Sequence, residues 1–475
     1  MSELRWFGPA LGLVAALTAL RIAALAASPT DLFVDESQYW LWGQSLGFGY
    51  YSKPPLVAWV IRLSTDIGGD TPFWVRLPAP LFHAATAMIL GAIAAALFDA
   101  RSAFWTALGY ATLPLASWGS FLISTDTIMA PFFALALLFW LRALDRRGVG
   151  WAAASGLAIG VAALAKYAAV YFLIGVALAA LRRDSRPTPA QAAALVLAFA
   201  LVIAPNVIWN LTHGLATVEH TIDNVGWIRG LSGLHPDRLA EFVLAQFGVF
   251  GPVLFAALLW QFAAPLGALQ RRLRPFSWPP LLLVSVQAVL SKAYANWAVA
   301  AYFAGTLIAV PALLRRAPRL LWLSMAVNTA LALLVALAVV TARDLRLGRD
   351  RPLLDRYLGR ADLSRQILDT ARANGAAAVV AGSRDILADL SFTGAGSGMP
   401  VYAPRPVGRP GNYYEETRPL PADPGGPVLA VLLQPPVCNG AALAPVARFD
   451  TAGGAYAGDA LAAYLVPPGC FDALG

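Results

Sequence analysis

The chain has 475 residues, of which 58% are hydrophobic and only 13% are charged, and its formal net charge is +8. The mean hydropathy is +0.62, and several apolar runs approach the ~20 residues that cross a bilayer. These values exclude a soluble globular enzyme. They predict a polytopic membrane protein with helical spans, because lipid offers no partners for backbone polar groups.

We predict eleven spans, and the positive charge between them gives their orientation. Arginines gather on one side, which the positive-inside rule makes cytoplasmic. The segment 151–181 has an alternative interpretation as one long helix, but this would move Arg182 and Arg183 to the other side. The predicted spans are 7–27, 76–98, 103–121, 127–144, 151–165, 167–181, 190–209, 241–262, 277–291, 294–314 and 319–341.

The first span has a competing interpretation. Arg5, the apolar run and "ALAAS" at 24–28 also resemble a cleaved signal peptide. The run is long for a signal peptide, which favours a retained helix. The orientation of the later spans is the same in both cases.

Two predicted external loops, 28–75 and 210–240, are long enough to carry function. The first contains "YWLWGQSLGFGYY", whose aromatic rings suit the membrane–water boundary and predict a short interfacial helix. Asp35 and Glu36 precede this aromatic segment and lie just outside the first span. Asp35 is either a solvated acid or helix cap, or a base at a membrane-level cavity. Glu36 points elsewhere on a helix, and a supporting or structural role suits it better.

The basic residues outside the arginine-rich loops indicate an anionic ligand. The chain has three lysines, Lys53, Lys166 and Lys292, and all three map to external helix ends. Arg76 lies at the external start of the second span, and Asp126, in "STDTIM", lies at the external junction of the third and fourth. An ammonium group suits a phosphate. The alternative is that the lysines only anchor helix ends by snorkelling.

Residues 342–475 differ from the membrane part, 1–341, because they contain 13 arginines and no spanning run. We predict a small external α/β domain there, with helices at 362–375 and 383–392 and strands at 376–382, 399–404, 427–434 and 461–467. It holds both cysteines, Cys438 and Cys470. A disulfide between them is plausible outside the cytoplasm, and the alternative is a pair of free thiols.

Several motifs are missing from the sequence. It contains no Asp-x-Asp pair, no Gly-x-Gly-x-x-Gly and no Walker loop, and its four histidines have no metal-ligand spacing with the cysteines. No basic stripe with interleaved aromatics indicates a nucleic-acid partner. We therefore expect neither a metal nor another cofactor.

The first loop, "DESQYWLWGQSLGFGYYSKPPLVAWVIRL" at 35–63, resembles that of bacterial glycosyltransferase family 39. That family is related to protein O-mannosyltransferases and to the lipid A aminoarabinose transferase. The resemblance continues through "RLPAPL" (76–81), "TDTIMAPFFALAL" (125–137), "NVIWNLTHGLATVEH" (206–220) and "YANWAVAAY" (294–302). It implies a GT-C fold and a transferase that moves a sugar from a polyprenyl-phosphate carrier to an acceptor on the periplasmic face.

The resemblance also implies roles for individual residues. Asp35 matches the catalytic acid of the first loop, and Asp126 matches a second acid of the family. Lys53 matches the contact to the carrier phosphate. Other groups expected near that phosphate are Arg76, Lys166, Arg229 or Arg238, Lys292 and Tyr294.

Two departures from the family bear on the substrate. Relatives such as the aminoarabinose transferase carry Arg where this chain has Gln38, so that sugar is in doubt. The lectin-like insertion of the eukaryotic enzymes is missing, which favours a lipid, lipid A or polysaccharide acceptor over a protein. The resemblance thus predicts an inverting glycosyltransferase of the bacterial inner membrane.

A transporter or flippase of polyprenyl-linked lipid is the main alternative. Such a protein would not need adjacent loop acids or a folded tail, and transporters carry polar groups near the midplane. Apart from Arg21 and His83, the predicted spans hold few such groups away from their ends. A membrane anchor with a sensing tail would leave the external acids and lysines unexplained.

Overall fold

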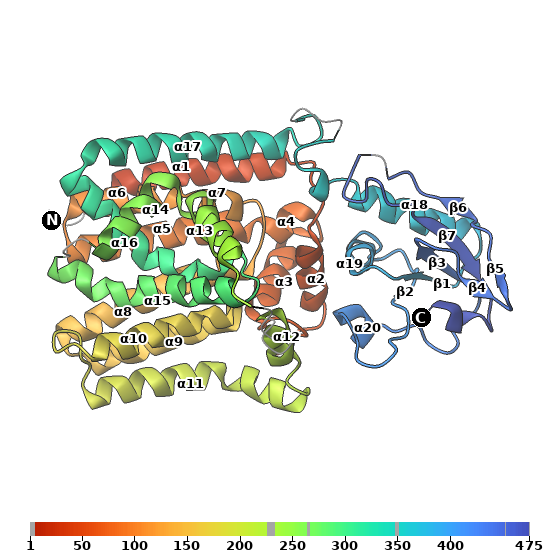
Figure 1. Cartoon of the computed structure of the whole chain (residues 1–475), viewed down its shortest axis with the longest axis horizontal. Coiled ribbons are helices and arrows are strands. Elements are labelled where there is room, and N and C mark those ends of the chain that lie inside the picture. The colour runs from red at the N-terminus through yellow and green to blue at the C-terminus, as the bar shows by residue number, and fades with distance from the viewer. Residues whose placement is uncertain (1–4, 226–232, 264–266, 347–350, 452, 475) are drawn as a thin grey trace. The chain divides into compact units, whose positions relative to one another are not determined.

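The computed structural model describes residues 5–225, 233–263, 267–346, 351–451 and 453–474 (Figure 1). The chain forms two compact units. We call one the membrane unit: residues up to Ala26, Leu46–Gly69 and Arg76–Leu337. The other, the tail unit, comprises Ala27–Ser45, Asp70–Val75 and Ala338–Gly475. The tail unit therefore takes in two segments of the first predicted external loop.

The membrane unit is almost entirely helical. Its helices are α1 (Phe7–Ala26), α3 (Leu56–Gly68), α5 (Pro78–Leu97), α6 (Ala100–Ala111), α7 (Pro114–Gly119), α8 (Thr125–Arg146), α9 (Val149–Ala165), η1 (Tyr167–Ala169), α10 (Val170–Ala180), α11 (Pro189–Thr212), α12 (Ala216–Val225), α13 (Pro236–Phe250), α14 (Pro252–Ala263), α15 (Ala268–Leu290), η3 (Ala295–Ala298), α16 (Ala300–Arg316) and α17 (Pro318–Val340). Helix α4 (Pro72–Arg76) links the two units along the chain.

Five helices in the described ranges are long and apolar enough to cross a membrane, or six if the bent pair α13–α14 counts as one span. The other predicted spans correspond to shorter, broken or more polar helices, so the count of eleven stays a prediction. The protein is nevertheless a multi-pass membrane protein. The ribbon breaks at Lys166 between α9 and α10, which excludes one continuous helix over 151–181.

The span predicted over 241–262 is wrong as a single straight helix. Helices α13 and α14 meet at Gly251 with a bend of 119°. Gly251 has a φ of 85°, which favours glycine, and Pro252 follows it. A Cβ at residue 251 would also lie 2.8 Å from the Asn328 side-chain oxygen. The predicted span 103–121 is likewise interrupted, between α6 and Pro114 at the start of α7.

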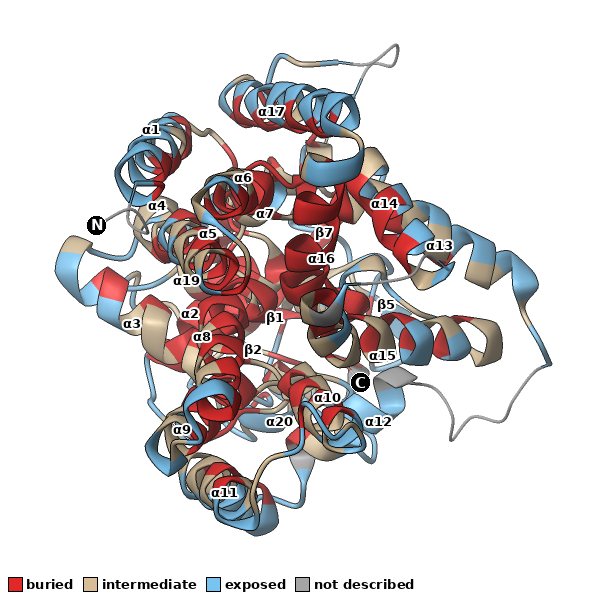
Figure 2. Cartoon of the chain, turned by 90° about the vertical axis from the view of Figure 1, so that its left-hand side faces the viewer, coloured by how far each residue is buried: buried red, intermediate tan, exposed pale blue. Residues whose placement is uncertain are grey.

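The core of the membrane unit surrounds α16, whose residues from Ala300 to Leu313 are all buried (Figure 2). Helix α11 is the opposite case, because it packs along α9 but exposes leucines such as Leu197 and Leu201. In a soluble protein such a surface would be unstable. In a bilayer it faces lipid, which agrees with the composition of the chain.

Helix α1 is an integral part of this bundle. It packs against α5 and α6, and the buried Arg21 donates from Nη2 to the Ala111 carbonyl at 2.7 Å and to Ser117 Oγ at 3.2 Å. Just before the helix, Trp6 is buried where Gly91 leaves room for its ring. These contacts support the retained helix over a cleaved signal peptide.

The tail unit has the predicted α/β character. Its C-terminal part contains η4 (Asp355–Tyr357), α18 (Arg360–Ala373), β1 (Ala378–Ala381), α19 (Arg384–Thr393), β2 (Val401–Tyr402), α20 (Tyr413–Thr417), β3 (Val428–Leu432), β4 (Val437–Cys438), β5 (Ala441–Ala442), β6 (Ala447–Arg448), β7 (Ala462–Val466) and η5 (Phe471–Leu474). All four predicted strands and both predicted helices are present, and β4, β5 and β6 are additional.

The main sheet has the strand order β2-β1-β3-β7-β6 (Figure 1). Strands β2, β1 and β3 run parallel, whereas β7 is antiparallel to both β3 and β6. Helices α18 and α19 pack against β1. Burial of β1 on both faces explains why its sequence reads as a continuous apolar run.

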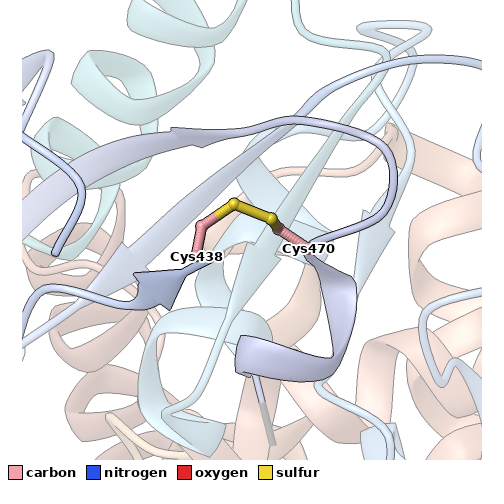
Figure 3. The surroundings of a disulfide bond; sticks show 2 residues. All are labelled: Cys438 and Cys470. Atoms are coloured by element: carbon pink, nitrogen blue, oxygen red, sulfur yellow. A yellow bond between two sulfur atoms is a disulfide. The ribbon is translucent and has the colours of Figure 1, made fainter. Parts of the chain in front are cut away.

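A disulfide joins Cys438 on β4 to Cys470 after β7, with the two Cα atoms 5.4 Å apart (Figure 3). Both cysteines belong to the buried cluster that also contains Val428, Tyr464 and Val466. The predicted pairing is confirmed. The disulfide links the β4–β5 hairpin to the segment after β7, across a sequence separation of 32 residues.

Helix α2 (Val34–Gly43) carries Asp35 and belongs to the tail unit. The prediction of an interfacial helix is wrong for it, because all of its residues except Asp35 are buried. The reason is that its aromatic face packs on the tail: Trp40 meets Phe392 at 4.9 Å and Trp42 meets Tyr413 at 5.8 Å between ring centroids. Helix α3 keeps the exposed apolar residues Leu63 and Ile67.

Candidate active site

Asp126 and Lys166 form the centre of the polar site in the membrane unit. Asp126 lies in the first turn of α8, which Ser124 caps, and Lys166 lies where the ribbon breaks between α9 and η1. Lys166 Nζ is 2.7 Å from both oxygens of Asp126, and Asn296 Nδ2 donates to Oδ2 at 2.8 Å. Helices far apart in sequence thus converge on one nearly buried carboxylate.

A cavity of about 330 Å³ adjoins this cluster. Lys53 and Lys166 both line it, so the cavity wall includes two of the three lysines of the chain. Most of its remaining wall is apolar or aromatic: Pro54, Tyr167, Ala168, Val170, Tyr171 and Trp297, with the hydroxyls of Ser52 and Thr221. Such a wall suits a phosphate carried on an apolar chain.

The loop that carries Lys53 is held by side chains of two later helices. Asn206 Nδ2 donates to the Phe48 carbonyl at 2.6 Å, and Thr217 Oγ1 donates to the Tyr50 carbonyl at 2.7 Å. Gly49 passes so close to the Trp209 ring that a Cβ there would lie 2.3 Å from a ring carbon. Helices α11 and α12 therefore determine where Lys53 is presented.

A second cavity of about 430 Å³ lies on another side of Asp126 and is mostly apolar. Tyr294 and Asn296 contribute to its wall from the segment before α16, and Trp118 and Phe303 contribute rings. His83 also lines it, but it is a buried residue with hydrogen-bond partners. Its Nδ1 lies 3.1 Å from the Tyr110 hydroxyl and its Nε2 lies 3.3 Å from Thr127 Oγ1.

In the tail unit, Asp35 is paired with an arginine that the sequence did not indicate. Arg384, in the first turn of α19, donates from Nη2 to Asp35 Oδ1 at 2.6 Å and from Nε to Gln38 Oε1 at 2.9 Å. The Asp35 side chain remains 44% exposed and that of Arg384 37%. Asp35 is therefore both held and accessible.

Further contacts fix the approach to α2. Asp31 Oδ2 accepts the Arg360 backbone N–H at 2.8 Å, and the Asp31 N–H donates to the Tyr357 carbonyl at 2.8 Å. Glu36 is buried, and its Oε2 accepts the Phe33 N–H at 2.8 Å, which caps the start of α2. This contact supports the structural role expected for Glu36 rather than direct catalysis.

Burial and the Asp35 charge both shift pKa values around α19. Desolvation opposes the charge of Arg384, but the charge and hydrogen bond of Asp35 outweigh it and raise the arginine pKa. Burial also raises the pKa of the nearby Tyr414 and keeps its phenol neutral. Asp389, on the same helix as Arg384, is buried, and this raises its pKa from 3.8 to about 6.

The remaining predicted site residues differ in how exposed they are. Arg76 is only 1% exposed and does not line either of the two cavities. Lys292 is exposed and its Nζ stacks 4.5 Å from the centroid of the Tyr294 ring. Arg229 lies outside the described residues. Within the described ranges, no group of three His, Cys, Asp or Glu side chains is arranged to hold a metal ion.

Sequence reasoning missed Arg384 and Asn296. Arg384 is one of 13 arginines in the tail, and nothing in its local pattern separates it from the others. Asn296 stands in "YANWAVAAY", which the resemblance had singled out only for the neighbouring Tyr294. Only the tertiary fold brings each of them to an acid.

Comparison with known proteins identifies the family of the chain. Residues 52–209 match the model of the dolichyl-phosphate-mannose-protein mannosyltransferase family. The lipid A galacturonosyltransferase RgtD of Rhizobium johnstonii is 39% identical over 464 residues, which cover 96% of this chain and 98% of that protein.

Two solved structures share the fold. ArnT from Cupriavidus metallidurans bound to undecaprenyl phosphate superposes with a TM-score of 0.67 at 15% identity, covering 95% of this chain and 97% of ArnT. The apo state of the same protein gives 0.59 at 16% identity, covering 89% and 93%. The resemblance drawn from the first loop is confirmed: the chain has a GT-C fold and belongs to the family of membrane glycosyltransferases that includes RgtD.

Proposed function

We propose that the protein transfers a uronic acid sugar from a polyprenyl-phosphate carrier to lipid A. The observation that carries the proposal is the cavity lined by two lysines, Lys53 and Lys166, together with apolar and aromatic residues. A lipid phosphate combines the charge and the chain that such a cavity accepts. The sugar and the acceptor follow from RgtD, named a lipid A galacturonosyltransferase.

The chemistry proposed for this site is one inverting displacement. A lipid A hydroxyl attacks the anomeric carbon of the sugar while the bond from that carbon to the phosphate oxygen breaks. The electron pair of that bond leaves with the polyprenyl phosphate, and the hydroxyl proton passes to Asp35. General-base assistance of this kind contributes about 10²–10⁴-fold to the rate.

The membrane unit supplies the charge for the leaving group. Lys53 and Lys166 would neutralise the phosphate as it departs, and Asp126 with Asn296 would keep Lys166 in place. Arg76, Arg229, Lys292 and Tyr294 are proposed as further contacts of the carrier. Of these, Lys292 and Tyr294 are the exposed groups in the described ranges, whereas Arg76 would need a rearrangement to reach a ligand.

The proposed location is the bacterial inner membrane, with the tail unit in the periplasm. The Cys438–Cys470 disulfide supports this placement, because disulfides persist in that compartment and not in the cytoplasm. Membership in a glycosyltransferase family favours this function over a transporter or flippase. No metal or other cofactor is part of the proposal, since the leaving phosphate needs only positive charge.

Reconstitution of the purified protein in nanodiscs tests the proposal. Polyprenyl phosphate carrying galacturonic acid, aminoarabinose or mannose is supplied with lipid A, and the products are weighed by mass spectrometry. We expect one galacturonosyl residue to be added, and we expect Asp35→Asn to slow transfer by about 10²–10⁴-fold. Asp66→Asn, which alters an exposed acid on α3, is the matched control. Transfer of only a neutral or cationic sugar, or full activity of Asp35→Asn, would refute the proposal.

A further inference from the structure

Arg384, from the C-terminal part of the tail unit, donates a hydrogen bond to the proposed catalytic acid Asp35. We infer that Arg384 is a positioning residue for Asp35, the base of the proposed reaction. The inference rests on the proposed function, because it assigns Arg384 a role only if Asp35 is the base.

The carboxylate of Asp35 is engaged on one side only. Its Oδ1 accepts the 2.6 Å hydrogen bond from Arg384 Nη2, whereas Oδ2 has no hydrogen-bond partner among the described side chains and backbone groups. A base needs one oxygen open to the hydroxyl from which it takes the proton. A carboxylate held through Oδ1 presents Oδ2 in a defined direction.

The guanidinium group is itself fixed at two points. Its Nε donates to Gln38 Oε1 at 2.9 Å while Nη2 holds Asp35, and the planar group cannot rotate without losing one of the two contacts. Gln38 and Asp35 are one helical turn apart, so both acceptors project from the same face of α2. Arg384 therefore bridges two adjacent positions on α2.

The helix that presents Arg384 is firmly seated against α2. Helices α19 and α2 pack along each other, with Trp40 edge-on to Phe392 at the far end of α19. At the near end, Ser383 Oγ accepts the Asp385 N–H at 3.2 Å and begins the helix directly before Arg384. A functional group on a rigid, capped helix is placed more accurately than one on a loop.

A purely structural role explains this pair less well. Ion pairs as exposed as Asp35 and Arg384 add little to folding stability. The packing of α2 on α19 is already provided by buried aromatic rings and by the Asp31 contacts with Arg360 and Tyr357. The remaining effect of the Arg384 contact is to orient the Asp35 carboxylate.

The experiment compares steady-state transfer by full-length variants in nanodiscs, with polyprenyl-phosphate galacturonic acid and lipid A as probes. Arg384→Ala should lower kcat on the order of 10²-fold, the cost of a misplaced catalytic group, and leave both KM values within roughly threefold. Arg384→Lys should regain part of kcat. Arg372→Ala is the matched control, because Arg372 is also ion-paired in the tail unit, to Asp369 at 3.0 Å.

A second variant moves the charge instead of removing it. In Arg384→Ala, the additional change Gln38→Arg places a guanidinium one turn from Asp35 and into the space that Arg384 vacates, so kcat should rise again. A role confined to the packing of α19 would not be restored from α2. In the Asp35→Asn background, removing Arg384 should have no further effect on kcat, because the group that it positions is already gone.

The outcomes separate this inference from the proposed function. If Asp35→Asn keeps its activity, the proposed base is wrong and the inference fails with it. If Asp35→Asn is inactive but Arg384→Ala has the wild-type kcat, the proposed function stands and the inference alone fails. The inference is also overturned if neither Arg384→Lys nor the added Gln38→Arg raises kcat above that of Arg384→Ala.

Discussion

The pair formed by Lys166 and Asp126 permits a quantitative test of the membrane site. Replacing Lys166 by Met removes two hydrogen bonds of 2.7 Å and leaves the Asp126 carboxylate with the hydrogen bond from Asn296 Nδ2 at 2.8 Å. The methionine keeps about the same side-chain length and removes both the charge and the hydrogen-bond donors of the lysine. The variant therefore removes the whole polar contact with Asp126.

The expected magnitude follows from burial. The side chain of Asp126 is 9% exposed and that of Lys166 is 19% exposed. Breaking a buried pair by removing one partner costs about 3–5 kcal/mol, and the surviving bond from Asn296 places Lys166→Met near the lower end. Asp126→Asn should cost less, because the lysine can turn toward the adjoining cavity. The double variant should be about 2 kcal/mol more stable than the sum of the single effects predicts.

The assay is unfolding of the purified protein in mixed SDS micelles, followed by tryptophan fluorescence. Transfer activity is measured in parallel, because the folded double variant still lacks one of the two ammonium groups that line the cavity and should bind the donor more weakly. Arg62→Met, which breaks an exposed pair with Asp66 on α3, is the control and should change stability little. Additive single effects, within error, would refute the reasoning that the two groups stabilise each other.

Three further predictions concern the tail unit and the loop that carries Lys53. Because the pKa of Asp389 is raised to about 6 in the folded protein, the stability it contributes is full below its ordinary pKa of 3.8 and is lost as the pH rises through about 6. In the wild type, the unfolding free energy should fall by about 3 kcal/mol between pH 4 and 7 because of this group, and Asp389→Asn should remove that fall. The same fall in the variant as in the wild type would contradict this. Cys470→Ser should destabilise the tail unit by about 3 kcal/mol, and dithiothreitol should then have no additional effect in hydrogen-exchange measurements. Gly49→Ala should press on Trp209 and displace the loop that carries Lys53, weakening donor binding roughly tenfold. The smaller ring of Trp209→Phe should relieve part of this loss. An unchanged KM for the donor in Gly49→Ala would contradict the prediction.

Local patterns in the sequence were sufficient for much of the fold. Long apolar runs gave the long helices, and short apolar runs bounded by glycine and proline gave all four predicted strands of the tail. Interruptions inside apolar runs were harder to see. The sharp bend at Gly251 and the break after Ala111 sit within stretches whose composition alone reads as continuous membrane helix.

The site could be predicted only where chemistry was local. Asp35, Lys53 and Asp126 stood out because acids and lysines are rare in such a chain. Their partners did not, because they depend on tertiary contacts across long separations: Arg384 meets Asp35 across 349 residues and Asn296 meets Asp126 across 170. The catalytic assignments of these acids and lysines stay predictions until variants are assayed.

The inclusion of α2 in the tail unit has a consequence for how the protein is made. Ribosomes add about 5–20 residues per second, so about 17–70 s pass between synthesis of Asp35 and of Arg384, 349 residues later. During that interval α2 has emerged, yet Phe392 and Tyr413, on which Trp40 and Trp42 pack, have not been made. We therefore expect α2 to take its final packing only after α19 and α20 have been synthesised. For the same reason, chimeras between relatives should exchange residues 27–45 together with the tail, since either segment alone would meet a foreign partner.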